Sequence, residues 1–231
     1  MNKLYRSTVA SLAAAILAFA LAGEARAVLT LSLSSGGDSF VVSDNGAGDL
    51  NPAPGAVTFS GPLGVFVINV TTGVSYPLLG SPTSPTLSLN SLDVTGTSGG
   101  TLTVSLSQVD FATSGDVLFL AKLGGAAIDG PTASITYDTF LGTGNTLFDT
   151  STLLTHIDVM GGIFAGSDTA TVNTTAPYSL TQVATLSLPS AAELISVTAT
   201  LQVPEPATLL LFALGLAGLG FYSHRRIGSR S

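Results

Sequence analysis

The stretch YSLTQVATLSL, Tyr178–Leu188, decides the fold class of this chain. Its alternate positions are mostly apolar, and the positions between them carry mainly polar side chains. Successive side chains of a strand point to opposite faces, so this alternation predicts a strand with one buried and one solvated face. The residues expected on the buried face are Tyr178, Leu180, Ala184, Leu186 and Leu188.

The same alternation recurs in TLTVSL (101–106), TASITYDTF (132–140) and ISVTATLQV (195–203). Strand-like runs of this kind, between frequent turn-forming clusters, are typical of an all-β fold. No stretch between residues 28 and 203 shows helical periodicity, although Pro189–Ile195 has room for one helical turn. The expected turns are Ser35–Asp38, Asp44–Gly48, Pro52–Gly55, Gly96–Gly100, Gly124–Gly125 and Gly142–Asn145.

These patterns predict an all-β domain over residues 28–202, built as an antiparallel β-sandwich or a jelly roll. A division into two sub-sheets near residues 124–131 remains an alternative. Tyr137 and Tyr178 fall on the apolar faces, which places them in the core rather than on a surface that stacks against sugars.

Charge is distributed unevenly along the chain. Residues 28–203 carry one basic residue, Lys122, against eleven aspartates and Glu193, a formal charge of −11 with histidine neutral. Such a surface repels phosphate backbones, which excludes nucleic acid as a partner and favours cations. The chain has no cysteine, so disulfides and thiolate metal sites are absent.

Residues 1–27 have the three parts of a secretory signal peptide helix. Lys3 and Arg6 precede the apolar run Val9–Ala22, and Ala25-Arg26-Ala27 supplies small residues around the expected cleavage point after Ala27. The apolar run is short for a membrane span. We therefore expect export of the mature chain.

Residues 203–231 have the features of a marginal transmembrane helix with a basic end. The uncharged stretch Ala207–Tyr222 would extend about 24 Å as a helix, less than the ~30 Å of a bilayer core. His224, Arg225 and Arg226 follow it and favour a cytoplasmic C-terminus. Before it stands Pro204-Glu205-Pro206, a rigid charged tripeptide suited to a helix boundary or to recognition by a membrane enzyme.

The whole segment, VPEPATLLLFALGLAGLGFYSHRR, resembles the PEP-CTERM sorting signal of Gram-negative bacteria. Pro204, Glu205 and Pro206 match its motif, Arg225 and Arg226 match its basic tail, and His224 stands where another basic residue is common. The resemblance covers about 25 residues of the chain. It implies an exosortase as processing partner, transient anchoring in the membrane, and association with the cell surface, extracellular polysaccharide and biofilm.

Two motifs in the domain suggest chemistry. Gly96-Thr97-Ser98-Gly99-Gly100 fits the G-x-S-x-G pattern of hydrolases, but strand-like runs flank it, so we interpret it as a hairpin turn.

The second motif is a loop that offers the oxygen ligands that calcium prefers, although glycines stand where the EF-hand loop needs ligands. An ordinary turn is the preferred interpretation of this loop and a calcium site the alternative. The candidate ligands are Asp44, Asn45, Asp49 and Asn51.

The sequence thus predicts a non-enzymatic, exported protein with a structural or interaction role and no required cofactor. A calcium- or polysaccharide-binding module on the same fold is the first alternative, and a surface hydrolase is the second. With one glutamate and no tryptophan in the domain, nothing favours a glycosidase.

Overall fold

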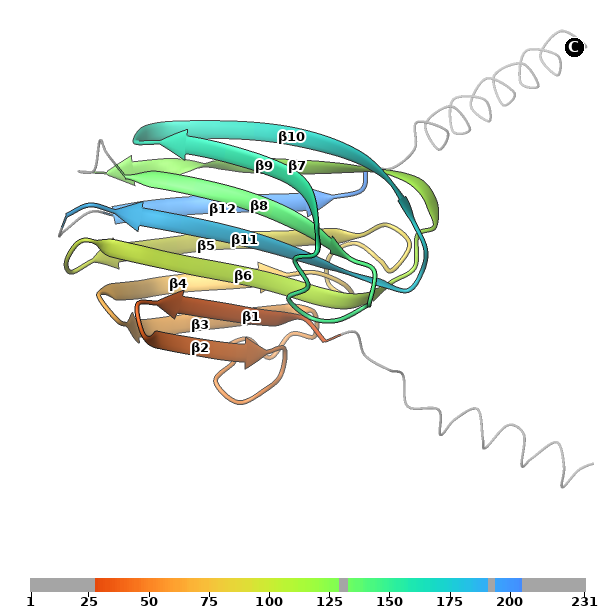
Figure 1. The fold of residues 1–231 in the computed structure, drawn as a ribbon. Helices are drawn as coiled ribbons and strands as arrows, with labels where there is room; N and C mark the ends of the chain where they lie inside the picture. The colour runs from red at the N-terminus through yellow and green to blue at the C-terminus, as the bar shows by residue number, and fades with distance from the viewer. Residues whose placement is uncertain (1–27, 129–132, 191–193, 205–231) are drawn as a thin grey trace, which may run out of the picture.

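The computed structural model describes residues 28–128, 133–190 and 194–204, which form two antiparallel sheets of six strands each (Figure 1). The strand order is β2-β1-β6-β11-β8-β9 in sheet A and β10-β7-β12-β5-β4-β3 in sheet B. Sheet A comprises β1 (Thr30–Ser35), β2 (Asp38–Ser43), β6 (Gly100–Phe111), β8 (Ser134–Gly142), β9 (Thr152–Met160) and β11 (Tyr178–Leu188). Sheet B comprises β3 (Ala56–Leu63), β4 (Phe66–Val74), β5 (Thr86–Gly96), β7 (Gly115–Ile128), β10 (Gly162–Thr174) and β12 (Leu194–Gln202).

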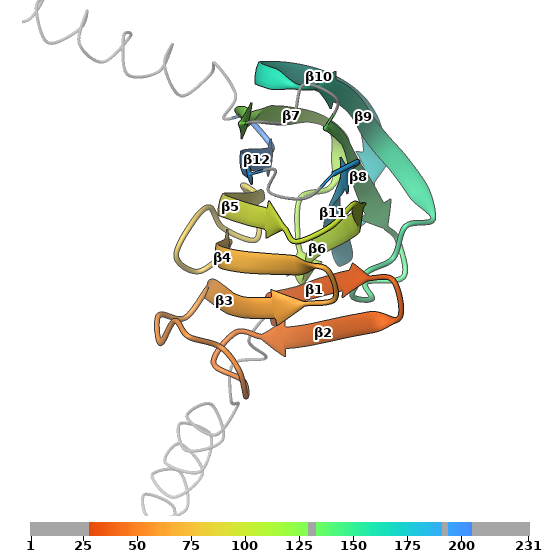
Figure 2. The ribbon, with the colours of Figure 1, turned by 90° about the vertical axis from the view of Figure 1, so that its left-hand side faces the viewer.

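The two sheets face each other and enclose one apolar core (Figure 2). One side of the sandwich is closed where β9 lies beside β10, and the other where β2 lies beside β3. Leu102, Val104 and Leu106 of β6 are fully buried, as their alternation predicted. Tyr137 and Tyr178 are also fully buried, which confirms their place in the core.

The β-sandwich prediction is confirmed. The alternative of two sub-sheets is wrong, because strands from both halves of the chain are interleaved in each sheet. Most connections pass from one sheet to the other. Only the β1–β2, β3–β4, β4–β5 and β8–β9 connections join neighbouring strands of the same sheet.

Two of the expected turns differ from the structure. Gly124 and Gly125 lie inside β7, where they pair with Phe164 and Ala165 of β10, rather than in a turn. The residues after Gly96 do not close a hairpin, because β5 belongs to sheet B and β6 to sheet A. They instead carry the chain across the sandwich.

The described part of the chain begins and ends at the same end of the sandwich (Figure 1). Beside β1, the Leu29 carbonyl accepts a hydrogen bond from the Asp44 amide at 2.8 Å. After β12, the Val203 amide donates to the Pro85 carbonyl at 2.9 Å. Val203 and Pro204 therefore lie at the end of the sandwich that also holds the loop at Asp44.

The predictions for the two termini, and for residues 191–193 of Pro189–Ile195, concern residues that the structure does not describe. These include the signal peptide helix and the transmembrane helix. Within residues 28–128, 133–190 and 194–204, no helix is long and apolar enough to cross a membrane.

Candidate functional site

The predicted sorting motif begins where the sandwich ends. Pro204 directly follows Val203, whose side chain packs against the core. Of the predicted sorting and cleavage residues, Pro204 alone is described. The others, outside the described residues, are Ala25, Ala27, Glu205, Pro206, His224, Arg225 and Arg226.

The loop predicted as a turn or a calcium site is organised around Asp49. Its Oδ1 accepts hydrogen bonds from the backbone amides of Asn51 and Thr58, both at 2.9 Å. Its Oδ2 accepts from the Asn45 amide at 2.8 Å. One carboxylate thus satisfies three backbone donors that have no strand partner, which is a structural role.

The other three candidate ligands are also engaged within this region. Asp44 accepts from the Asn45 side-chain amide at 2.7 Å and from the Gly55 amide at 2.7 Å. Asn51 Oδ1 accepts from the Ala53 amide at 3.0 Å. In the described part of the chain, no three His, Cys, Asp or Glu residues form a group suited to a metal ion. The structure brings the four predicted residues together and gives the side-chain oxygens of Asp44, Asp49 and Asn51 protein donors. Calcium binding here stays a prediction.

His156, on the outer face of β9, lies between two aspartates that the sequence analysis did not single out. Its Nδ1 is 2.6 Å from Asp138 Oδ1 on β8, and its Nε2 is 2.9 Å from Asp158 Oδ2 on β9. On β10, Asp168 accepts a hydrogen bond from the His156 backbone amide at 3.1 Å. Part of this cluster could have been predicted from the sequence. His156 and Asp158 are two residues apart in a strand-like run, and alternate residues of a strand lie on the same face.

The surroundings of His156 favour its charged form. The hydrogen bonds to Asp138 and then Asp158 raise the pKa of His156 above its usual value. The pKa of Asp158 is lowered by the hydrogen bond from Thr136 and then by His156. A neutral imidazole has one donor only, so an imidazolium is the form that donates to both carboxylates.

Ser98 does not occupy a nucleophile elbow. That motif requires a strand, a sharp turn and a helix, whereas Gly100 begins strand β6. The Ser98 hydroxyl contacts the Gly99 carbonyl at 3.4 Å. Both ring nitrogens of His156 are bonded to aspartates, so among the described residues His156 has no serine as hydrogen-bond partner.

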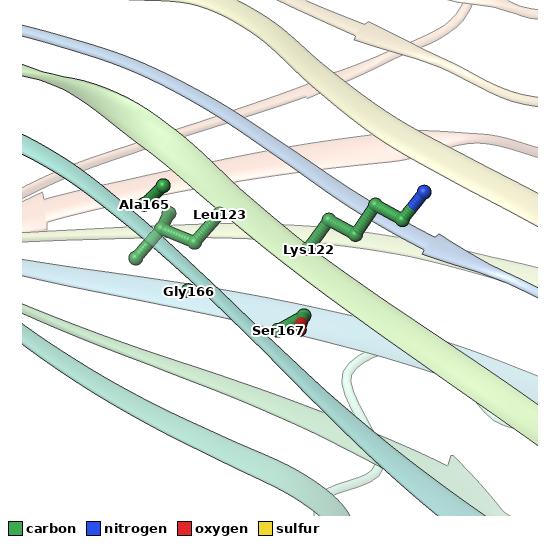
Figure 3. A pocket seen from close by; sticks show the side chains of 5 residues that line it. All are labelled: Lys122, Leu123, Ala165, Gly166 and Ser167. Atoms are coloured by element: carbon green, nitrogen blue, oxygen red, sulfur yellow. The ribbon is translucent and has the colours of Figure 1, made fainter.

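A shallow hollow of about 540 Å³ lies between β7 and β10 (Figure 3). Lys122 stands beside it, and its register partners are Ser167 on β10 and Thr200 on β12. Lys122 forms no ion pair within the described residues. The hollow is therefore lined by one hydroxyl group, of Ser167, and by the side chain of Lys122, whose ammonium group extends away from Ser167 (Figure 3). Its lining consists of Lys122, Leu123, Ala165, Gly166 and Ser167.

The solved structures that are similar to this chain have low sequence identity to it. TmCBM61, a carbohydrate-binding module solved with β-1,4-galactotriose, has 5% identity and a TM-score of 0.34, covering 57% of this chain and 87% of its own. TmCBM27, a carbohydrate-binding module that recognises mannan, has 13% identity and a TM-score of 0.30, with coverages of 61% and 89%. The K3 adhesin domain of Lys-gingipain from Porphyromonas gingivalis has 10% identity and a TM-score of 0.32, with coverages of 58% and 74%.

No curated protein matches this chain. A family model does match its C-terminal segment, over residues 202–226. This range contains Pro204-Glu205-Pro206 and the basic residues His224, Arg225 and Arg226. The chain therefore carries a PEP-CTERM protein-sorting motif at residues 202–226.

Proposed function

We propose that this chain is an exported, non-enzymatic β-sandwich protein with a structural or interaction role at the cell surface or in the extracellular matrix. The observation that carries the proposal is the PEP-CTERM motif at residues 202–226. The motif starts at Gln202, the last residue of β12, so sorting segment and folded domain adjoin. Such a motif implies processing by an exosortase during export.

In this proposal each of three parts of the chain has its own role. Residues 1–27 direct export, residues 28–202 form the delivered domain, and residues 203–231 hold the chain at the membrane until processing. The described chain ends at Pro204 at one end of the sandwich, and the β9–β10 connection lies at the opposite end (Figure 1).

The test of sorting is the replacement of Pro204, Glu205 and Pro206 by alanine in the producing organism. We expect export to continue while the unprocessed chain accumulates in the membrane fraction. The matched control replaces Ser196, Thr198 and Thr200 of β12 by alanine and should be processed normally. Normal processing and surface delivery of the Pro-Glu-Pro variant would refute the proposal.

Polysaccharide binding is a second candidate function, and the hollow beside Lys122 favours it. The Lys122 ammonium group, which has no ion-pair partner among the described residues, and the Ser167 hydroxyl suit a sugar polymer that carries acidic groups. Calorimetry of the full chain with the host's own polysaccharide should give heat that Lys122→Gln reduces. Ser105→Ala, on the outer face of sheet A, serves as the control, and absence of heat with the unaltered chain removes this candidate.

A further inference from the structure

Two glutamine side chains lie inside the sandwich, among the apolar residues of sheet A. Gln108 on β6 and Gln182 on β11 are 0% and 1% exposed. Each follows the alternation of its strand onto the core face, Gln108 after Leu106 and Gln182 between Leu180 and Ala184. A buried amide is unfavourable unless its donors and acceptors find partners.

Each of these amides is satisfied on one side only. Gln108 Nε2 donates to the Tyr76 carbonyl at 2.9 Å, and Gln182 Oε1 accepts from the Tyr137 hydroxyl at 2.7 Å. Gln108 Oε1 and Gln182 Nε2 have no hydrogen-bond partner within the described residues. These two side chains therefore leave one acceptor and one donor free in the interior, where the buried hydroxyls of Thr71 and Tyr178 also have no partner among the described residues.

The strand register brings these two free atoms into the same region. On the paired strands β6 and β11, Gln108 lies opposite Leu180 and Gln182 lies opposite Leu106. The two glutamines are thus diagonal neighbours on one face, with Cα atoms about 7–8 Å apart in such an arrangement. This separation is within the combined reach of two glutamine side chains and one small bridging molecule.

The chemistry of the free atoms identifies the class of ligand. The occupant must accept a hydrogen bond from an amide N–H and donate one to an amide oxygen. A metal cation offers no acceptor for the N–H, and a simple anion offers no donor for the oxygen, whereas water does both. We propose that a buried water molecule bridges Gln108 Oε1 and Gln182 Nε2, a site independent of the proposed function.

The bridging water would complete a polar band across the interior face of sheet A. Gln182 lies opposite Thr139 on β8, and Thr139 lies opposite Thr155 on β9. The hydroxyls of these two buried threonines are 2.6 Å apart. With the water in place, hydrogen-bonding groups continue from β6 to β9, which favours this register over one shifted by a residue.

A crystal structure of the full chain at high resolution tests the proposal directly. We expect an ordered water within hydrogen-bond distance of both Gln108 Oε1 and Gln182 Nε2. NMR should show magnetisation transfer from a long-lived water to the Gln182 side-chain amide protons. A direct hydrogen bond between the two amides, or density without water between them, would overturn the proposal.

A double-mutant cycle provides the energetic test. Every chain in the cycle, including the reference, carries Tyr137→Phe, because replacing Gln182 would otherwise also leave the Tyr137 hydroxyl without its acceptor. In this background, Gln108→Met and Gln182→Met should each lower the Tm of the full chain by roughly 2–10 °C. The double variant should lose less than the sum of the two, because neither amide remains to need the water. A control cycle pairs Gln182→Met with Thr174→Val, whose hydroxyl donates to the Thr113 carbonyl, and should be additive. Additive losses for the two glutamines would contradict a shared water.

Discussion

His156 and Asp138 face each other across strands β9 and β8, with His156 Nδ1 2.6 Å from Asp138 Oδ1. The second ring nitrogen contacts Asp158, and the His156 backbone amide donates to Asp168 on β10. Carboxylates from three strands therefore converge on one residue at the side of the sandwich where sheets A and B meet. Protonation of His156 compensates part of this negative charge.

The stability of the fold should fall as the pH rises above the usual His156 pKa of 6.5. The folded-state pKa is raised, by Asp138 first and Asp158 second, so the stabilisation is complete below 6.5 and is lost as the pH rises through the folded value. The contribution of the Asp138–His156 pair is expected to be at most about 1 kcal/mol, since half-exposed pairs are screened by solvent. Urea unfolding of the full chain at pH 5.5 and pH 8 measures this difference.

His156→Gln is the matched variant for this measurement. It retains hydrogen-bonding capacity without the charge, so its unfolding midpoint should change less between pH 5.5 and pH 8 than that of the unaltered chain. Asp158 has the opposite pH dependence, because its folded-state pKa is lowered. Its contribution to stability is present above its usual pKa of 3.8 and is lost as the pH falls through the folded-state value. Equal pH dependence of variant and unaltered chain above pH 5 would show that the cluster contributes nothing to folding.

The strands were the most predictable part of this molecule. Alternation placed Leu102, Val104, Ile195 and Val197 on buried faces, and all four are at most 1% exposed. Period-two patterning is a local property, so a single strand reveals which face is buried without knowledge of its neighbours. The same pattern says nothing about which strands pair, because that depends on the whole chain.

The errors arise at residues whose role depends on distant neighbours. Gly124 and Gly125 have the composition of a turn, but β10 and β12 pair with them on either side and keep them in β7. Gln182 falls on the apolar face of YSLTQVATLSL, and only the Tyr137 hydroxyl on the next strand explains its burial. The cluster at His156 likewise joins three strands that are separated in sequence.

Asp49 should be the residue of its loop on which stability depends most. Asp49→Ala removes an acceptor from three backbone amides, of Asn45, Asn51 and Thr58. Unpartnered amides in a partly buried loop should lower the free energy of unfolding by about 1–3 kcal/mol. Denaturant unfolding measures the loss. Asp38→Ala, at an exposed position of β2, is the control and should change stability by less than about 0.5 kcal/mol.

Addition and removal of calcium should leave the stability of the fold unchanged. Both carboxylate oxygens of Asp44 and of Asp49 already accept hydrogen bonds, so calcium would compete with protein donors for these carboxylates. The measurement compares the Tm of the full chain in EDTA and in millimolar calcium. A rise in Tm with calcium that disappears in Asp49→Asn would instead support the calcium site.

Gly125 and Gly124 should respond oppositely to the same substitution, although they are adjacent in β7. A Cβ atom at Gly125 would overlap the Ser196 carbonyl oxygen and lie 2.8 Å from Cζ of Phe164, so Gly125→Ala must displace a neighbouring strand. Overpacking of this kind should lower the free energy of unfolding by about 1–3 kcal/mol.

At Gly124 the nearest atom to a Cβ, the Phe164 carbonyl oxygen, is 3.9 Å away. Gly124→Ala therefore fits, and it reduces the entropy of the unfolded chain. Urea unfolding of both variants should show a loss for Gly125→Ala and no loss, or a small gain, for Gly124→Ala. Equal losses would mean that β7 does not lie between β10 and β12 in the register described.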